Sequence, residues 1–256
     1  MPTRDGYPEG VPSWVDLSTT DVEKARAFYE ALFGWNIQEA ESDSMPYWMA
    51  YQKGRAAAGL GPAQGEPRFS AWTTYFAVDD ADATVAKIRD AGGQIVFEPT
   101  DIMEMGRMAI AADPSGAVFG IWQAGQHKGA GIVNEHGALN WNELQVDDVS
   151  KELEFYRAVF GHTTEETEGG SGPYYVMSAG DRPVAGAMAK PAPEIPNSWS
   201  VYFAVDDADA AVETATEHGG HVSFGPMDLP SVGKIAGLVD PTGGHFTVIQ
   251  LAGEID

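Results

Sequence analysis

Two acidic residues lie in the middle of otherwise apolar, strand-like segments. Asp16 belongs to the run WVDL at 14–17, and Glu143 belongs to the run WNEL at 141–144. A carboxylate that leaves water needs a partner. A salt bridge or a position at a sheet edge would supply one. The alternative is a carboxylate that faces a ligand, with a pKa raised by apolar surroundings, so that it acts as a general base or a hydrogen-bond anchor.

Other groups that commonly carry catalysis give weaker signals. The six histidines, at positions 127, 136, 162, 218, 221 and 245, form no short cluster with the spacing of metal ligands. The absence of cysteine excludes disulfides and thiolate chemistry. The sequence has neither a Gly-x-Ser-x-Gly elbow nor a Gly-rich loop between a strand and a helix. Chemistry would therefore depend on the carboxylates and on Tyr or His side chains near them.

The composition is typical of a globular protein. The chain has 256 residues, of which 43% are hydrophobic, enough for one large domain or two medium domains that each have a core. No segment approaches the roughly 18 apolar residues of a membrane span, and the N-terminus lacks an apolar signal region. A net charge of −23 repels nucleic acid and anionic lipid, so neither is an expected partner. We expect a cytoplasmic protein, either a monomer or a homodimer.

The strongest signal is an internal repeat with a constant offset of 127 residues. Three pairs of segments show it: Phe28-Tyr29 with Phe155-Tyr156, residues 75–83 with 202–210, and Asp113-Pro114-Ser115-Gly116 with Asp240-Pro241-Thr242-Gly243. Because one offset holds from the first strand to the last turn, the two halves differ by little net insertion or deletion. The repeat predicts two domains, 1–125 and 137–256, joined by a Gly-rich polar linker at 126–136.

Each half divides again into two units with the order strand, helix, three strands. In the first unit, a strand at 14–17 precedes a helix that begins after Asp21 and ends at Gly34, with apolar residues at helical spacing between them. In the second, a helix begins after Asp79 or Asp80 and stops at Gly92-Gly93. The predicted units span about 12–63, 71–124, 139–190 and 198–252.

In this order the motifs resemble the vicinal oxygen chelate superfamily, which includes glyoxalase I, extradiol dioxygenases and bleomycin-resistance proteins. The motifs are Asp21 with Phe28-Tyr29 and Phe33-Gly34, then Ala77-Val78-Asp79-Asp80, Gly92-Gly93, and Gly106-Arg107 with Asp113-Pro114-Ser115-Gly116, with counterparts in the second half. The arrangement is also similar to a tandem actinobacterial subgroup that includes a mycobacterial culture-filtrate antigen and proteins called hydroxylases. The resemblance implies an α+β fold of four βαβββ modules whose curled mixed sheets form cups.

The resemblance also implies where a metal would bind, because metal-using members take His, Gln or Glu ligands from four strand positions. These positions fall on or near Trp14, Gly59, Thr73 and Gly120 in the first half, and Trp141, Gly186, Ser200 and Thr247 in the second. None of these residues is a good ligand for a divalent ion. We expect no metal and no other cofactor. A divalent ion held by groups such as Asp16, Glu143 and His245 is the alternative.

If these positions face the cup, alternation along the strands places their neighbours two residues away on the same wall. The expected ligand-binding residues are Trp14, Asp16, Tyr75, Trp122, Trp141, Ser200 and Thr247. In the second half, Glu143, Tyr202 and His245 are expected to converge as catalytic residues. Val118 replaces the histidine in the first half, so at most one half is expected to be catalytic. Core packing is the competing interpretation for the aromatic residues.

Three functions remain open. The favoured one is metal-independent binding of a small aromatic or apolar molecule, as in resistance proteins of the superfamily. The second is an enzyme (a lyase, an isomerase or an oxygenase/hydroxylase-like protein), either metal-free with Glu143 and His245 or metal-dependent. The third is an interaction protein with an inert duplicated fold.

Overall fold

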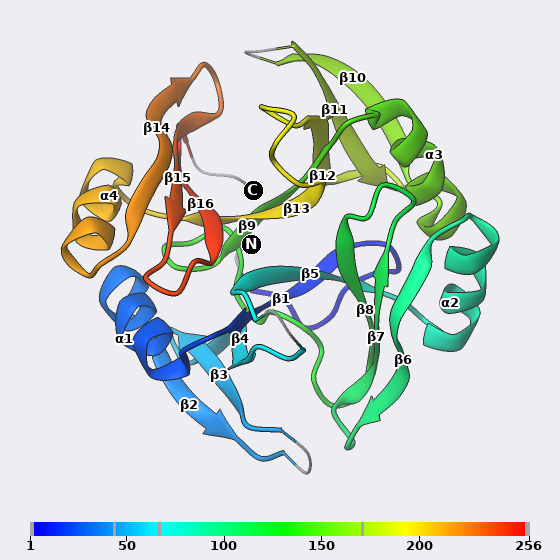
Figure 1. Cartoon of the computed structure of the whole chain (residues 1–256), viewed down its shortest axis with the longest axis horizontal. Coiled ribbons are helices and arrows are strands. Elements are labelled where there is room, and N and C mark those ends of the chain that lie inside the picture. Colours follow the sequence, from blue (N-terminus) through cyan, green and yellow to red (C-terminus); the bar gives the residue numbers. More distant parts are fainter. Residues whose placement is uncertain (1–2, 43–44, 66–67, 170–171, 254–256) are drawn as a thin grey trace.

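Two eight-stranded mixed sheets lie back to back, and helices flank them in two pairs (Figure 1). This computed structural model describes residues 3–42, 45–65, 68–169 and 172–253. All strands of the first sheet come from the first half of the chain, and all strands of the second sheet come from the second half. Each cup therefore forms within one half. The α+β fold with four βαβββ modules is as the sequence predicts.

The first sheet has the strand order β2-β3-β4-β1-β5-β8-β7-β6. Its first module contains β1 (Pro12–Thr19), α1 (Val22–Phe33), β2 (Asn36–Ala40), β3 (Tyr47–Gln52) and β4 (Arg55–Pro62). Its second module contains β5 (Ala71–Ala77), α2 (Ala81–Asp90), β6 (Gln94–Ile102), β7 (Gly106–Ala112) and β8 (Val118–Ala124). β1 is parallel to β4 and antiparallel to β5, so the modules join at the centre of the sheet.

The second sheet repeats this topology in the order β10-β11-β12-β9-β13-β16-β15-β14. Its third module contains β9 (Leu139–Val146), α3 (Val149–Phe160), β10 (Thr163–Gly169), β11 (Gly172–Ala179) and β12 (Arg182–Ala189). Its fourth module contains β13 (Ser198–Ala204), α4 (Ala208–Glu217), β14 (His221–Leu229), β15 (Gly233–Val239) and β16 (His245–Leu251). Strand β13 again pairs antiparallel with β9 at the centre.

Local sequence sets the limits of the helices. The Asp21 carboxylate accepts a hydrogen bond from the backbone N of Lys24 at 3.0 Å, which satisfies one of the free N–H groups at the start of α1. Gly34 ends the helix in the left-handed conformation, with φ 67°. Asp80 caps α2 in the same way as Asp21 caps α1. Both predicted helix starts are confirmed, with Asp80 rather than Asp79 as the cap of α2.

The two halves share their hydrophobic cores, which differs from the expectation of one core in each half. Helix α1 lies beside α4, and α2 lies beside α3 (Figure 1). One core joins the first and fourth modules, for example through Phe33 and Phe203, whose ring centroids are 5.1 Å apart. The other core joins the second and third modules. Helix α1 carries a wide aromatic face, and strands of the other half help to cover it.

Two hydrogen bonds between tyrosine and aspartate cross from one half to the other. The Tyr29 hydroxyl donates to Asp240 Oδ2 at 2.9 Å, and the Tyr156 hydroxyl donates to Asp113 Oδ2 at 3.0 Å. Asp113 Oδ1 accepts from the backbone N of Ala117 in its own turn. The sequence predicts only a turn role for these aspartates. Tertiary structure adds a link between the halves.

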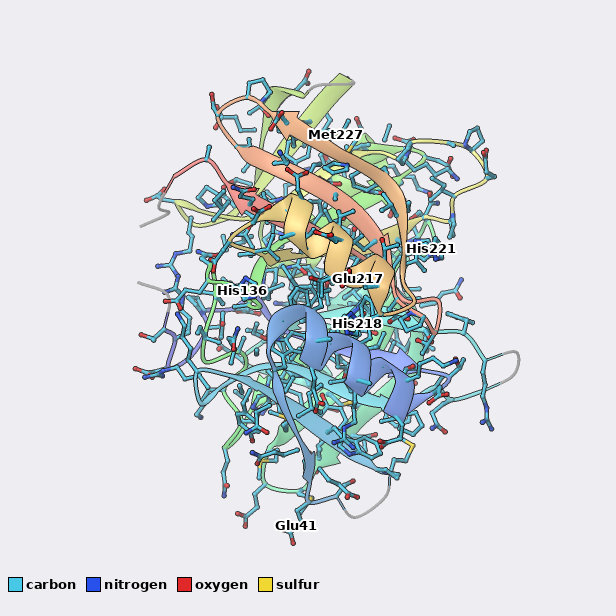
Figure 2. The ribbon with its side chains drawn as sticks, turned by 90° about the vertical axis from the view of Figure 1, so that its left-hand side faces the viewer. Glu41, His136, Glu217, His218, His221 and Met227 are labelled. Atoms are coloured by element: carbon cyan, nitrogen blue, oxygen red, sulfur yellow. The ribbon has the colours of Figure 1, made fainter. Side chains whose placement is uncertain are left out.

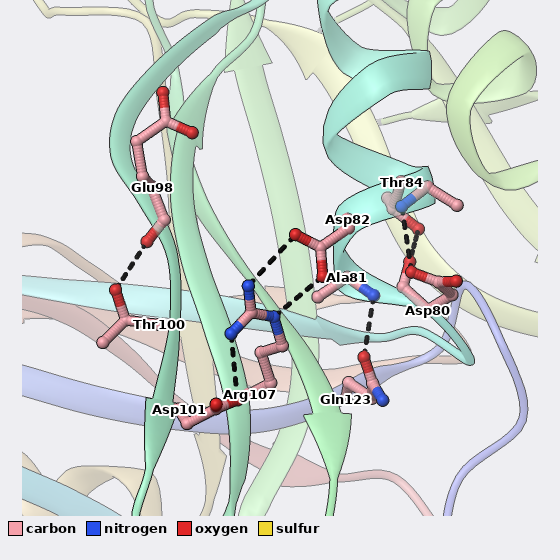
Figure 3. Close-up of polar contacts among 10 residues, drawn as sticks. Asp80, Ala81, Asp82, Thr84, Glu98, Thr100, Asp101, Arg107 and Gln123 are labelled. Carbon is pink, nitrogen blue, oxygen red and sulfur yellow. Dashed lines mark hydrogen bonds and ion pairs between the residues drawn. The ribbon is translucent and has the colours of Figure 1, made fainter.

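The predicted Gly106-Arg107 motif ties strand β7 to its neighbours. The Arg107 guanidinium donates to both carboxylate oxygens of Asp82, in the first turn of α2, and to Asp101 on β6 (Figure 3). Lys234 makes the equivalent ion pair with Asp209 in the second half. These carboxylates are exposed, so each pair adds little to stability. No helix in the described part of the chain is long and apolar enough to span a membrane.

Candidate functional site

The cup of the first sheet, cup 1, holds a carboxylate between two tyrosines. Asp16 Oδ2 accepts hydrogen bonds from the hydroxyls of Tyr75 at 3.1 Å and Tyr47 at 3.3 Å. The indole N–H of Trp14 donates to the Tyr47 oxygen at 3.0 Å. Strands β1, β3 and β5 present these four side chains on one face of the sheet. The acid in the apolar strand is thus partnered by phenols rather than by a cation.

The cup of the second sheet, cup 2, repeats this arrangement with a longer acid. Glu143 Oε1 accepts from the Tyr202 hydroxyl at 2.9 Å and from Gln145 Nε2 at 2.8 Å. Trp141 Nε1 donates to the Tyr174 oxygen at 2.9 Å, as Trp14 does to Tyr47. Sequence reasoning missed Tyr47 and Tyr174. A detectable signal was present, because the two tyrosines are related by the offset of 127 residues.

Glycines make room for the tyrosines at strand positions where the family resemblance implies metal ligands. A Cβ added to Gly59 would lie 1.8 Å from the Tyr47 hydroxyl oxygen, and one added to Gly186 would lie 1.8 Å from that of Tyr174. A Cβ on Gly120 would lie 2.1 Å from the ring of Tyr75. No larger residue fits at these positions unless the tyrosine moves.

Burial controls the proton affinity of both acids. It raises the pKa of Asp16 to about 6, although the hydrogen bonds from Tyr75 and Tyr47 oppose the shift. Burial likewise raises the pKa of Glu143, which is 5% exposed, against the hydrogen bonds of Gln145 and Tyr202. Burial and the adjacent carboxylate raise the pKa of Tyr202 well above its usual value. The tyrosines therefore stay protonated and donate, while the carboxylates accept.

The structure brings only part of the predicted catalytic set together. Glu143 and Tyr202 are in contact, and Thr247 lies within hydrogen-bonding reach of Tyr202. Ser200 is opposite Glu143 in the strand register. His245 is exposed at the start of β16, and within the described residues no hydrogen bond joins it to Glu143 or Tyr202.

The remaining predicted ligand-binding residues differ in exposure between the cups. Trp14, Tyr75 and Trp122 are buried, whereas Trp141 is partly exposed. Tyr202, Ile235 and Ile249 form a small apolar cluster, against which Trp141, Leu229 and Leu251 pack. Cup 2 therefore combines an aromatic and aliphatic surface with one carboxylate.

The linker closes cup 1. The ring of His127 packs against Trp14 with a centroid distance of 4.4 Å, and against Trp122 at 5.6 Å. Trp122 Nε1 donates to the backbone oxygen of His127 at 2.9 Å. The sequence predicts that His127 lies in the linker and indicates no role for it. No local pattern predicts this contact.

A recess of about 190 Å³ opens beside the linker at the end of β8. Tyr7, Trp122 and Lys128 are among the residues that line it, and neither Asp16 nor Glu143 does. Among its lining groups, the Tyr7 hydroxyl donates to the backbone oxygen of Ala130, and burial raises the pKa of Tyr7. We assign the recess no function.

Comparison with known proteins places these cups in a family. The profile of the "Glyoxalase/Bleomycin resistance protein/Dioxygenase superfamily" matches residues 12–121 and 138–246. The chain belongs to this superfamily. It is 46% identical to the protein CFP32 of Mycobacterium tuberculosis, whose name assigns it provisionally to the glyoxylases, over 98% of this chain and 99% of that protein. It is 35% identical to the anthracycline biosynthesis protein DnrV of Streptomyces peucetius, over 96% and 94% of the two chains.

Solved structures of the superfamily share the fold. A Mn(II)-bound glyoxalase from Novosphingobium aromaticivorans has a TM-score of 0.64 and 16% identity, with 97% of this chain and 87% of that chain covered. The 2,3-dioxygenase LapB from Pseudomonas sp. KL28 has a TM-score of 0.66 and 15% identity, with 94% and 93% covered. At these identities the likeness concerns the fold alone.

The strand positions where the resemblance implies metal ligands carry side chains that are poor donors to a divalent ion. The equivalent strand positions carry indoles, hydroxyls and glycines overlaid by tyrosine rings, whereas divalent ions need imidazole or carboxylate donors in a fixed array. No group of three or more His, Asp or Glu residues in the described ranges is arranged to hold an ion. Figure 2 shows His136, His218 and His221 at separate places on one side of the molecule.

Proposed function

We propose that this protein binds a small aromatic organic molecule in cup 2 without a metal ion. The observation that carries the proposal is the ring of Tyr174 over Gly186, next to the buried carboxylate that accepts from Tyr202. Such a site offers ring contacts and one strong hydrogen-bond acceptor. Cup 2 is the binding cup because Trp141 remains partly exposed there, whereas Trp14 in cup 1 is covered.

The chemistry of cup 2 favours a flat guest that carries a hydroxyl group. Trp141 and the cluster around Ile249 supply apolar contact, and Glu143 accepts a hydrogen bond. A neutral guest suits a protein of net charge −23 better than an anionic one. DnrV is named for the biosynthesis of anthracyclines, which are polycyclic aromatic compounds. That name supports, for this chain, a hydroxylated polycyclic aromatic ligand.

The proposal is tested by titrating quinizarin, a neutral dihydroxyanthraquinone, into the full-length protein at pH 7. Calorimetry and quenching of tryptophan fluorescence measure the dissociation constant. We expect saturable binding that Trp141→Phe weakens about tenfold, equivalent to about 1.4 kcal/mol. The matched control is Trp48→Phe, which changes a tryptophan of β3 next to, but not part of, the Trp14–Tyr47 contact.

Two results would refute the binding function. One is the absence of both heat and quenching up to the solubility limit of quinizarin. The other is equal weakening by the Trp141 and Trp48 substitutions, because that would place the ligand outside cup 2.

The second candidate function is proton transfer by Glu143. This acid is buried, burial raises its pKa, and the Tyr202 hydroxyl donates to it at 2.9 Å, which are features of a general base. Its substrate class would be aromatic ketones with an acidic C–H next to the carbonyl. Exchange of that proton for deuterium in hydroxyacetophenone, followed by NMR, measures the reaction. Glu143→Gln should abolish any catalysed exchange, and exchange that persists in this variant rules out Glu143 as the base.

A further inference from the structure

A ring from the chain itself occupies cup 1. The planes of His127 and Trp14 meet at 83° with their centroids 4.4 Å apart, and those of His127 and Trp122 meet at 66°. These are the edge-to-face geometries that aromatic pairs prefer. The backbone oxygen of His127 also satisfies the indole N–H of Trp122. One linker residue thus provides ring contacts to both tryptophans and a hydrogen-bond acceptor for the Trp122 indole.

Ring contacts, rather than polar contacts, hold the imidazole. His127 Nε2 is buried and has no hydrogen-bond partner in the described structure, and burial lowers the pKa of the ring to about 4. A buried nitrogen without a partner destabilises the folded state. The imidazole is therefore a neutral guest, and its contacts with Trp14 and Trp122 must offset that cost.

The backbone on both sides of His127 is fastened to the cup. Its N–H donates to the Met105 oxygen at 3.0 Å, and the Ala130 N–H donates to the Ser13 oxygen at 2.7 Å. Gly129 has φ 99°, and a Cβ there would lie 2.4 Å from the Ser13 oxygen. Only glycine permits the linker to lie this close to β1. The ring position is a consequence of a firmly placed segment.

Cup 2 presents the same indole without this covering contact on the described residues. Trp141 donates to Tyr174 as Trp14 donates to Tyr47, so the two indoles are oriented alike. Ile249 stands where cup 1 has Trp122. The residue that corresponds to His127 is Glu254, which lies outside the described residues.

We infer that His127 is a built-in occupant of cup 1, and that cup 2 takes one neutral planar aromatic ring at the corresponding place, edge to face on Trp141. The part concerning cup 2 rests on the proposed binding function. The two similar cups would therefore have different roles. One cup is closed by the linker, the other has no such covering ring among the described residues, and the stoichiometry is one guest per chain.

The test opens cup 1 and offers it a replacement ring. His127→Ala removes the imidazole, and free imidazole is titrated at pH 8.5, where it is mostly neutral. We expect imidazole to raise the melting temperature of this variant by several degrees and to leave the wild type unchanged. Lys128→Ala, at the exposed neighbouring residue, is the matched control and should behave as the wild type does. Binding of quinizarin should rise from one molecule per chain in the wild type to two in His127→Ala.

A second variant keeps the test decisive if His127→Ala folds poorly. His127→Phe retains a ring at this position without the unpartnered nitrogen. It should therefore fold, show no change in melting temperature with imidazole, and bind one quinizarin molecule per chain. The inference is wrong if imidazole does not stabilise His127→Ala, if wild-type protein binds two quinizarin molecules, or if His127→Phe binds two. If no variant binds quinizarin but His127→Ala responds to imidazole, the proposed function fails and the assignment of cup 1 stands.

Discussion

A buried acid between the two halves should make the stability of the protein depend on pH. Glu152 in α3 is 1% exposed, and its Oε2 atom has no hydrogen-bond partner in the described structure. Burial, and then the carboxylate of Asp113, raise its pKa from 4.5 to about 7. Lys151 Nζ is 4.0 Å away on an exposed side chain and offsets little of this cost. The first half has Ala25 at the equivalent position.

The direction in which stability changes with pH follows from proton binding to Glu152 in the folded and unfolded states. Between pH 4.5 and 7 the folded state holds the Glu152 proton more tightly than the unfolded state does. The free energy of unfolding therefore falls as pH rises through this window, and it levels off above pH 7. The two pKa values give a loss of about 2.5 kcal/mol between pH 5 and pH 9, which is an upper estimate because relaxation around a buried charge reduces it.

Urea unfolding of wild type and Glu152→Gln from pH 5 to pH 9 isolates this group, because all other titrations cancel in the difference. This range stays above the isoelectric point of about 4.4. We expect Glu152→Gln to gain up to about 2.5 kcal/mol on the wild type as pH rises. Glu154→Gln is the control, since its side chain is 64% exposed on the same helix. A difference between wild type and Glu152→Gln that does not change with pH would refute the reasoning.

Three other predictions concern the cups and the contact between the halves. Tyr156→Phe removes the hydroxyl that crosses to the other half, and should lower the free energy of unfolding by about 1.5–3 kcal/mol; a change below about 0.5 kcal/mol in urea would contradict this. Gly59→Ala places a Cβ 1.8 Å from the Tyr47 hydroxyl oxygen and should lower the melting temperature. Gly61→Ala is the control, because its Cβ would lie at an ordinary contact distance of 3.5 Å from the Tyr47 ring and should leave the melting temperature unchanged. Equal effects of the two substitutions would show that the ring position is wrong. The Asp16 carboxyl should titrate near pH 6 in ¹³C NMR, with its signal assigned by loss in Asp16→Asn; titration below pH 4 would mean that the group is not desolvated.

The shared cores make separation of the halves costly. Aromatic residues of α1 contact strands of the second half, and the Tyr–Asp hydrogen bonds cross at two places. An isolated half would expose this surface. We therefore expect the two sheets to unfold as one cooperative unit, even though the topology repeats completely.

The sequence by itself determined the repeat, the order of elements in each module and the helix limits at Asp21 and Gly34. These features depend on residues close together in the chain, where caps, turns and periodicity act locally. It also identified Asp16 and Glu143, because an acid in an apolar strand stands out wherever the strand lies. The constant offset contained the tyrosine pair as well, although only their contacts reveal their role.

Only tertiary structure decided what surrounds those acids. The curling and pairing of strands far apart in the chain decide three features. They decide whether His245 reaches Glu143, which rings lie over Gly59 and Gly186, and what His127 contacts. Local preferences do not encode these distances, because a small change in sheet curvature moves a side chain in or out of a cup. The burial that raises the pKa values and closes cup 1 is a property of the assembled chain.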